Sequence, residues 1–343
     1  MNFASDNAYG VLPQIWPALE AADKGAALAY GNDTLTRDLT ARFSALFERE
    51  VAAFPVYTGT AANALALACL TPSFGAVLCH QDSHIMTSEC GAPEFYSGAK
   101  LVGMQSPNGK FTPDDIAQAL AGLDGSVHSV QPRAVSVSQA SELGTVYSPA
   151  ELAAIADVTH ERGMKLHMDG ARFANAMAFL GCTPAEGTWK SGVDVLSFGA
   201  TKAGALAAEA VVFFDPALAS EFEYRRKRGG HLASKMRFVS AQLEAMLKGD
   251  LWLQSGARAN ALAARVAGTL EKAPGIEIAY PVETNMVFAR MPVEKAARMR
   301  AGGAQFHDWF PAQKDGMVIT RLAFAFATPE EHVAKLIELA NME

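Results

Sequence analysis

The sequence predicts an α/β fold with a mostly parallel β-sheet that helices cover on both faces. Short runs of continuously apolar residues alternate with segments that carry helix-start signals, and this alternation is typical of such a sheet. The chain has 343 residues, of which 50% are hydrophobic, so it can bury a large core and form two lobes. We place the boundary near residue 246, where a basic helix gives way to an alanine-rich tail.

Apolar runs in the middle of the chain define the expected strands. A strand at 133–139, a helix at 149–162 and a strand at 164–169 make a β-α-β unit of the usual length. Further apolar runs, DVLSFGA at 194–200 and AVVFFD at 210–215, extend the same sheet. Because the runs lack polar alternation, we expect these strands to be buried on both faces.

Three expected helices begin with the same local signal. A hydroxyl residue caps the helix, proline takes the first helical position, and an acidic residue follows three positions after the cap. The signal occurs at Ser148, Pro149 and Glu151, at Thr112, Pro113 and Asp115, and at Thr328, Pro329 and Glu331.

Composition argues against several kinds of partner. The net charge of -7 makes nucleic acid an improbable main ligand, despite the basic run RRKRGG at 225–230. No apolar run is long enough to cross a membrane, and the first residues lack the basic and apolar blocks of a signal peptide. The 4 cysteines form no CxxC pair, so we expect reduced thiols in a cytoplasmic protein.

Charged side chains at strand ends mark a candidate site, because ligands of open α/β sheets bind beyond the carboxyl ends of the strands. Asp169 lies at such an end, His84 follows the apolar strand at 75–80, and Lys202 follows a later strand among small residues. Each has a structural alternative. Asp169 could cap the next turn through Gly170, His84 could be a hydrogen-bonded structural histidine, and Lys202 could lie on the surface.

An anion site is expected at Thr58, Gly59 and Thr60, where an apolar stretch leads into an alanine-rich helix. Free backbone N–H groups and the helix dipole attract anions at such a junction. The alternative is an ordinary glycine turn with a capping threonine. We predict no metal site, because the spacing of the nearby cysteines and histidines fits no usual zinc pattern. These residues are Cys79, His80, His84 and Cys90.

The combination of a phosphate site, a strand-end aspartate and a lysine one strand later favours pyridoxal phosphate. Lys202 would form the Schiff base, and Asp169 would keep the ring nitrogen protonated so that the ring acts as an electron sink. An opposite charge in contact moves a pKa by about 1–3 units, or about 1.4–4 kcal/mol in favour of the pyridinium.

With these residues in place, the sequence resembles the pyridoxal-phosphate-dependent low-specificity L-threonine aldolases, which have the aspartate aminotransferase fold (fold type I). The resemblance covers nearly the whole chain. It rests on an ordered set of motifs: Ser5-Asp6-Asn7, YGND (30–33), TGTAAN (58–63), DSHI (82–85), HMDGAR (167–172) and SFGATK (197–202).

The resemblance implies a division of the chain into two domains. A large cofactor-binding domain with a mostly parallel, seven-stranded type of sheet would cover 11–245. A smaller α+β C-terminal domain would cover 246–343 and include the N-terminal arm 1–10.

The resemblance also implies roles for the cofactor site. Lys202 holds the cofactor, Asp169 pairs with the ring nitrogen and His84 stacks on the ring, so these three are the expected catalytic residues. Gly59 and Thr60 hold the phosphate.

For the substrate side, the resemblance implies that Arg172 contacts the ring oxygen and binds the substrate carboxylate together with Ser5 and Arg321. The family forms homodimers or homotetramers with active sites at the dimer interface. There Arg237 would reach the neighbouring subunit's phosphate, and Tyr30 would lie at the interface beside the substrate.

Gln139 departs from the family, which often has a histidine at this place. A glutamine can hydrogen-bond a substrate hydroxyl but cannot take its proton. We therefore expect Gln139 to bind substrate, and we expect the base to be His84 or a water that Gln139 holds.

The expected function is that of a carbon–carbon lyase in threonine catabolism. It would cleave L-threonine, L-allo-threonine or related β-hydroxy-α-amino acids such as phenylserine to glycine and an aldehyde. Another enzyme with the same cofactor, an aminotransferase or a β-eliminating lyase, is the nearest alternative. A non-catalytic binding or regulatory protein on this fold is a remote one.

Overall fold

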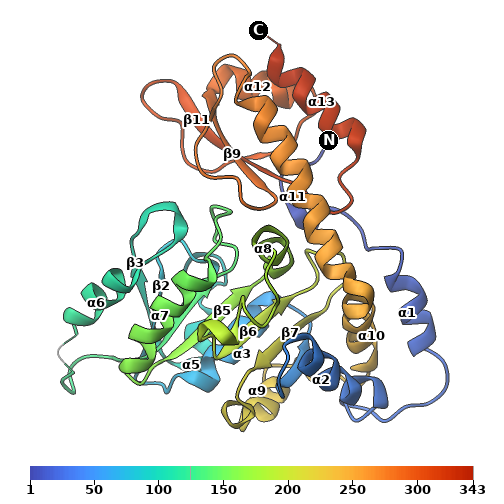
Figure 1. Cartoon of the computed structure of the whole chain (residues 1–343), viewed down its shortest axis with the longest axis vertical. Coiled ribbons are helices and arrows are strands. Elements are labelled where there is room, and N and C mark those ends of the chain that lie inside the picture. Colours follow the sequence, from blue (N-terminus) through green and yellow to red (C-terminus); the bar gives the residue numbers. More distant parts are fainter. Residues whose placement is uncertain (124, 343) are drawn as a thin grey trace.

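The computed structural model describes residues 1–123 and 125–342, which form a large lobe around a seven-stranded sheet and a smaller lobe around a four-stranded sheet (Figure 1). The strands of the large sheet are β1 (Ala52–Val56), β2 (Gly75–His80), β3 (Lys100–Met104), β4 (Gln131–Ser138), β5 (Lys165–Gly170), β6 (Val195–Gly199) and β7 (Glu209–Phe213). Their order is β1-β7-β6-β5-β4-β2-β3. β7 runs antiparallel to both neighbours and the other pairs are parallel, so the predicted mostly parallel sheet is confirmed.

Helices cover both faces of the large sheet because its buried side chains alternate between two cores. In β6, Val195 packs into the core on one face, while Leu196 and Phe198 pack into the core on the other. One face is covered by α3 (Gly59–Leu70), α5 (Ala92–Ser97) and α9 (Phe222–Arg228). The other is covered by α2 (Thr34–Leu46), α6 (Pro113–Ala121), α7 (Pro149–Glu161), α8 (Phe173–Leu180) and α10 (Arg237–Leu247). The helices α1 (Ile15–Ala22) and α4 (His84–Thr87) also belong to this lobe.

The capping signals predict two of three helix starts. Ser148 and Thr112 form capping boxes with Glu151 and Asp115, and proline follows each cap. At α13 (Glu330–Asn341) the prediction was wrong, because Thr328 does not cap the helix. Its side chain is fully buried, and its Oγ1 instead accepts a hydrogen bond from the backbone N–H of Ala325 (2.9 Å) within the preceding loop.

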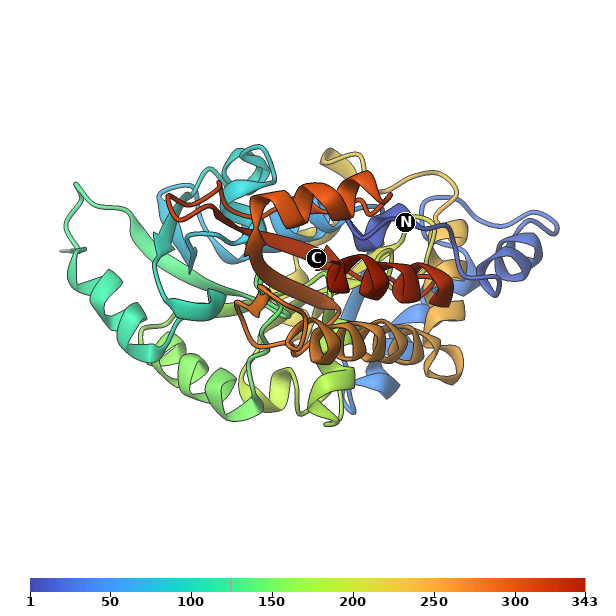
Figure 2. The ribbon, with the colours of Figure 1, turned by 90° about the horizontal axis from the view of Figure 1, so that it is seen from above.

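The smaller lobe is an antiparallel sheet packed by three helices, as Figures 1 and 2 show. Its strands, in the order β10-β11-β9-β8, are β8 (Glu277–Ile278), β9 (Met286–Pro292), β10 (His307–Asp308) and β11 (Met317–Ala323). Its helices are α11 (Leu251–Leu270), α12 (Val293–Ala301) and α13. Phe3 of the N-terminal arm is buried in the same core.

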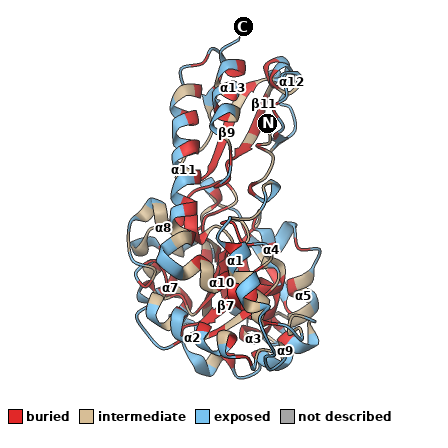
Figure 3. Ribbon diagram, turned by 90° about the vertical axis from the view of Figure 1, so that its right-hand side faces the viewer, coloured by how far each residue is buried: buried red, intermediate tan, exposed pale blue. Residues whose placement is uncertain are grey.

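The long helix α11 connects the two lobes (Figure 3). Trp252, near its start, belongs to the core of the large lobe, and Leu262, halfway along, belongs to the core of the small lobe. The exact domain boundary near residue 246 stays a prediction. Among the described residues, no helix is both long enough and apolar enough to cross a bilayer.

Candidate active site

Two adjoining cavities lie at the carboxyl edge of the large sheet. The smaller, of about 230 Å³, is lined by Thr58, Gly59 and Thr60 and by Asp169. The larger, of about 440 Å³, extends toward the small lobe. Asn7, His84 and Lys202 line both. Strand ends that are distant in sequence therefore meet at one place, as the parallel sheet predicts.

The start of α3 forms one wall of the smaller cavity. The Oγ1 of Thr58 accepts a hydrogen bond from the backbone N–H of Ala61 (3.2 Å), which is the expected capping contact. A Cβ at Gly59 would meet no atom within 4 Å, so the space beside this backbone is open. The first backbone N–H groups of the helix can therefore be reached by an anion.

Asp169, at the end of β5, faces the same cavity and is only 6% exposed. Its Oδ2 accepts a hydrogen bond from Nδ2 of Asn63 (2.9 Å), and its Oδ1 accepts one from the backbone N–H of Ala171 (3.0 Å). The sequence left two alternatives for Asp169, a cap of the next turn or a place in the site. The structure shows both, because Asp169 caps this turn and also lines the cavity.

Lys202 lies in the turn after β6, between the two cavities. Burial lowers the pKa of Lys202, and the nearby positive charge of Arg172 lowers it further. The charges of Asp6 and Asp169 act in the opposite direction but do not cancel the effect. A lowered pKa leaves a larger fraction of neutral amine, which is the nucleophilic form.

His84 begins α4 and is held by a buried carboxylate. Its Nδ1 lies 2.9 Å from Oε1 of Glu89, and the same oxygen accepts a hydrogen bond from Nδ2 of Asn63 (2.9 Å). The hydrogen bond with Glu89 is the main cause of a raised pKa of His84. The side-chain amide of Asn63 therefore donates both to Glu89, which holds His84, and to Asp169.

Two arginines, Arg172 and Arg321, line the larger cavity. Arg172 donates from Nε (2.7 Å) and Nη2 (3.2 Å) to the carboxylate of Asp6. Burial alone would raise the pKa of Asp6, but the charges of Arg172 and Lys202 hold it below its usual range. Arg321 of β11 lies over the Trp309 ring at 4.8 Å, and its Nη2 donates to the carbonyl of Ala4 (2.8 Å).

The arm of residues 1–10 contributes to this cavity as well. Ser5, Asp6 and Asn7 all line it, and Oγ of Ser5 accepts a hydrogen bond from the backbone N–H of Asn7 (3.1 Å). The structure therefore brings Ser5, Arg172 and Arg321 together with Lys202, as expected for a carboxylate site.

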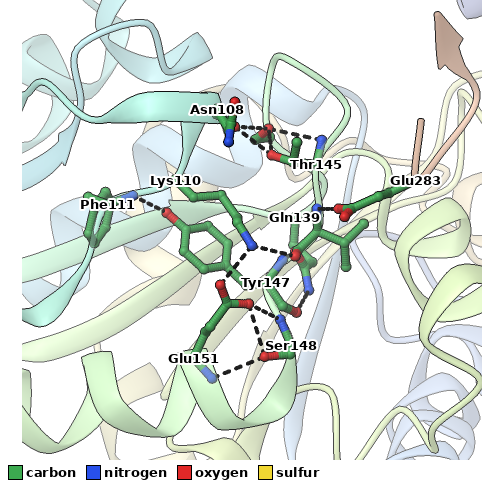
Figure 4. A network of polar contacts seen from close by, with 11 residues as sticks. Asn108, Lys110, Phe111, Gln139, Thr145, Tyr147, Ser148, Glu151 and Glu283 are labelled. Carbon is green, nitrogen blue, oxygen red and sulfur yellow. Dashed lines mark hydrogen bonds and ion pairs between the residues drawn. The ribbon is translucent and has the colours of Figure 1, made fainter. Parts of the chain in front are cut away.

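Gln139 is placed differently from our expectation, and its assignment to substrate binding needs correction. Its side chain is fully buried, and both ends of its amide bind the backbone of Tyr147 (Figure 4). Nε2 donates to the Tyr147 carbonyl (2.9 Å), and the Tyr147 N–H donates to Oε1 (3.0 Å). The amide holds the loop after β4, and Gln139 does not line either cavity. It is therefore not in position to hold a water for the substrate.

Tyr30 and Arg237 lie away from both cavities of their own chain. Tyr30 is 49% exposed, and the Nζ of Lys227 lies 4.4 Å from the centre of its ring. Arg237 lines a separate surface hollow beside α1 and α2. Their expected roles require a second subunit and stay predictions.

Among the residues of the site that were not predicted from the sequence are Asn63, Glu89 and Glu142. Glu89 and Asn63 form the buried link described above, and Glu142 lines the larger cavity. Glu142 could have been predicted, because it follows the end of β4 closely. A charged residue near a strand end is also the feature that identified Asp169. Asn63 and Glu89 lie inside or beyond helices, where a sequence pattern does not distinguish them.

Glu209, at the start of β7, is a further buried carboxyl in the smaller cavity. Its Oε2 accepts a hydrogen bond from the backbone N–H of Ala200 (2.8 Å), and burial raises its pKa to about 7. An acid with a raised pKa in the folded state contributes stability below its ordinary pKa, and this is lost as the pH rises through about 7.

We therefore expect Glu209→Gln to stabilise the cofactor-free protein at pH 8, by about 3 kcal/mol at most, and to have a much smaller effect at pH 5. Urea unfolding of both proteins at the two pH values measures the difference. A stability change of the same size at pH 5 and pH 8 would show that the Glu209 carboxyl is not perturbed.

The fold and the site together define the class of protein. The structure of an aspartate aminotransferase from Rhodobacter sphaeroides has the same fold (TM-score 0.71, 18% identity, 99% of this chain and 93% of that chain), a likeness that bears on the fold alone. With the strand-end lysine, aspartate and phosphate site, the class is that of the fold-type-I pyridoxal-phosphate enzymes.

The chain belongs to the beta-eliminating lyase family, whose sequence model matches residues 2–294. It is 47% identical to the low specificity L-threonine aldolase of Pseudomonas sp. (strain NCIMB 10558) over 89% of this chain and 88% of that protein. The Pseudomonas aeruginosa protein of the same name is also 47% identical, over the same shares. The structure of Leishmania major threonine aldolase matches with a TM-score of 0.93 at 30% identity, over 99% of this chain and 98% of that chain. The resemblance to threonine aldolases is thereby confirmed.

Proposed function

We propose that this protein is a pyridoxal-phosphate-dependent lyase that cleaves the Cα–Cβ bond of L-threonine, L-allo-threonine and related β-hydroxy-α-amino acids, giving glycine and an aldehyde. The observation that carries the proposal is a cavity in which Lys202 faces Arg172 and Arg321, in a chain 47% identical to threonine aldolases. An amine and two guanidinium groups around one small cavity suit an α-amino acid.

Pyridoxal phosphate fits the donors of the smaller cavity. Backbone N–H groups at Gly59 and Thr60 suit a phosphate, the Asp169 carboxylate suits a protonated ring nitrogen, and the Lys202 amine suits an aldehyde. When bound, the cofactor supplies a carbonyl that bonds to amines and a ring that accepts the electron pair of the bond being broken.

The residues of the chain would then position the substrate. Arg172, Arg321 and Ser5 would hold its carboxylate. Asp6 accepts one hydrogen bond from Nε and one from Nη2 of Arg172, so both N–H groups of Nη1 and the second one of Nη2 are left for the substrate. A fixed carboxylate would hold the substrate in one orientation relative to the cofactor, and this is catalysis by orientation. His84 lines the smaller cavity and would lie beside the cofactor, and its Nδ1 is held by Glu89, so Nε2 is the edge available to the substrate hydroxyl.

We propose that the active enzyme is a cytoplasmic homodimer or homotetramer that acts in threonine catabolism, and that Tyr30 and Arg237 complete the site of a neighbouring subunit. The exposure of Tyr30 and the position of Arg237 in a surface hollow support an interface role.

Products separate this function from its nearest rivals. Incubation with L-threonine and L-allo-threonine should give glycine and acetaldehyde, and phenylserine should give glycine and benzaldehyde. A 2-oxo acid from these substrates would instead indicate an aminotransferase or a β-eliminating lyase.

The carboxylate site yields a specific prediction. Arg321→Ala leaves a buried carboxylate with one partner fewer, which costs about 2–5 kcal/mol. We expect kcat/KM for L-threonine to fall roughly 30-fold or more, while the affinity for the cofactor changes little.

Steady-state kinetics and a cofactor titration measure both quantities. The matched control is Arg290→Ala on the neighbouring strand β9, since Arg290 pairs with Glu277 (2.9 Å) and does not line the cavity. An equal loss of cofactor affinity in Arg321→Ala would assign Arg321 to the cofactor or to the fold.

A further inference from the structure

The loop after β4 carries a carboxylate whose function the mechanism above does not explain. Glu142 lines the larger cavity together with Lys202, Arg172 and His84. Its Oε1 accepts two hydrogen bonds, from the backbone N–H of His84 (2.8 Å) and from Oγ of Ser138 (2.9 Å). These contacts fix the carboxylate between the end of β4 and the start of α4.

The second oxygen of Glu142 lacks such partners. Oε2 is closed off from solvent and accepts no hydrogen bond from any residue in 1–123 or 125–342. A buried carboxylate oxygen without a donor is costly, so a partner that donates to it would be favourable. A ligand in the cavity with a hydroxyl group would provide the missing donor.

His84 is poorly suited to take a proton. The hydrogen bond with Glu89 raises the pKa of His84, so a larger fraction of it is imidazolium at a given pH than in a free histidine. An imidazolium can donate from Nε2 to a substrate oxygen, but it has no free lone pair with which to accept a proton. We therefore look for the group that accepts the proton of the substrate hydroxyl among the other residues of the cavity.

We propose that Glu142 binds the β-hydroxyl of the substrate and accepts its proton. The inference rests on the proposed aldolase function and names the base for that reaction. The O–H bond breaks and its proton goes to the carboxylate, while the O–H electron pair forms the carbonyl of the aldehyde. The electron pair of the broken Cα–Cβ bond stays with the glycine half until a proton is returned to Cα.

The surroundings of Glu142 suit a base. Burial raises the pKa of Glu142, and the nearby charge of Asp169 adds to this, although the hydrogen bond from the His84 N–H opposes it. A carboxylate with a raised pKa accepts a proton more readily near neutral pH. Ser138 and the His84 backbone are positioning groups, because they orient Glu142 and need not touch the substrate.

The test compares two reactions of the cofactor-loaded enzyme. Cleavage of L-threonine needs the hydroxyl proton removed, whereas exchange of the Cα proton of glycine in D2O uses the same cavity without a hydroxyl. Glu142→Gln keeps an oxygen for both accepted hydrogen bonds but is not a base. We expect its kcat for cleavage to fall about 100-fold or more. Glycine affinity, measured by calorimetry, and the exchange rate, measured by NMR, should stay within about threefold of wild type.

Two further variants keep the result interpretable. Glu142→Asp retains the charge but withdraws the carboxylate, and it should lose cleavage about 10-fold or more while keeping exchange. Glu283→Gln is the matched control: Glu283 accepts a hydrogen bond from the backbone N–H of Val146 (2.6 Å) at the same loop, outside the cavity. It should retain both reactions.

Cleavage by Glu142→Gln at the wild-type rate would overturn the proposal. An equal loss of cleavage, glycine affinity and exchange would also overturn it, because Glu142 would then serve the fold or cofactor binding. If the wild-type enzyme neither cleaves L-threonine nor exchanges glycine, the proposed function itself fails, and the role of Glu142 with it.

Discussion

Replacing Lys202 by alanine should abolish cleavage of L-threonine, with a loss of about 10⁴-fold or more in kcat. The amine lies between the start of α3 and the two arginines, and burial lowers its pKa. No other lysine of residues 1–123 and 125–342 lines either cavity, so none is in position to replace it. We expect the folded state to survive, because the Lys202 side chain lines the two cavities. Steady-state kinetics and thermal unfolding measure the two effects.

Chemical labelling tests the same residue independently of activity. Borohydride reduction of the loaded protein followed by peptide mapping should place the cofactor on Lys202. Lys165 is the matched control, since its Nζ pairs with Asp194 (3.0 Å) near the opposite end of β5, and Lys165→Ala should keep the label and the activity. Labelling of Lys165 or Lys235 would show that the assignment of the cofactor site is wrong.

Asp169→Asn should cause the second-largest loss. The substitution keeps the size of the side chain but removes the charge that favours a protonated ring nitrogen, which is worth about 1–3 pKa units. We therefore expect kcat to fall by about 10- to 1,000-fold, because each pKa unit corresponds to about 1.4 kcal/mol. Kinetics and the visible spectrum of the bound cofactor report the change. A variant with wild-type kcat and an unchanged spectrum would remove Asp169 from the mechanism.

The large sheet and the core of the site follow from local sequence features. Apolar runs and capping boxes predict β4, α7 and β5 nearly to the residue, since these signals depend only on neighbouring positions. Asp169 and Lys202 are found in the same way, because a charge directly after a buried strand must lie at the sheet edge. Thr328 shows the limit of local signals, since tertiary burial directs its hydroxyl into the preceding loop.

The rest of the site depends on contacts that one stretch of sequence does not contain. Asn63 meets Asp169 across 106 residues, and that pairing depends on how α3 packs against the sheet. Successive side chains near a strand end point in opposite directions. Ser138 therefore faces Glu142, whereas the next residue, Gln139, faces the core. Tyr30 and Arg237 act on a second subunit in the proposed assembly, so a single chain does not bring them to the site.

The most direct measurement of the central claim is the product balance from L-threonine with the purified, cofactor-loaded enzyme. Glycine and acetaldehyde should form in equal amounts, without 2-oxobutanoate or ammonia, and Lys202→Ala should form neither product. Formation of 2-oxobutanoate and ammonia in place of glycine would contradict the account, because the bond broken would then not be Cα–Cβ.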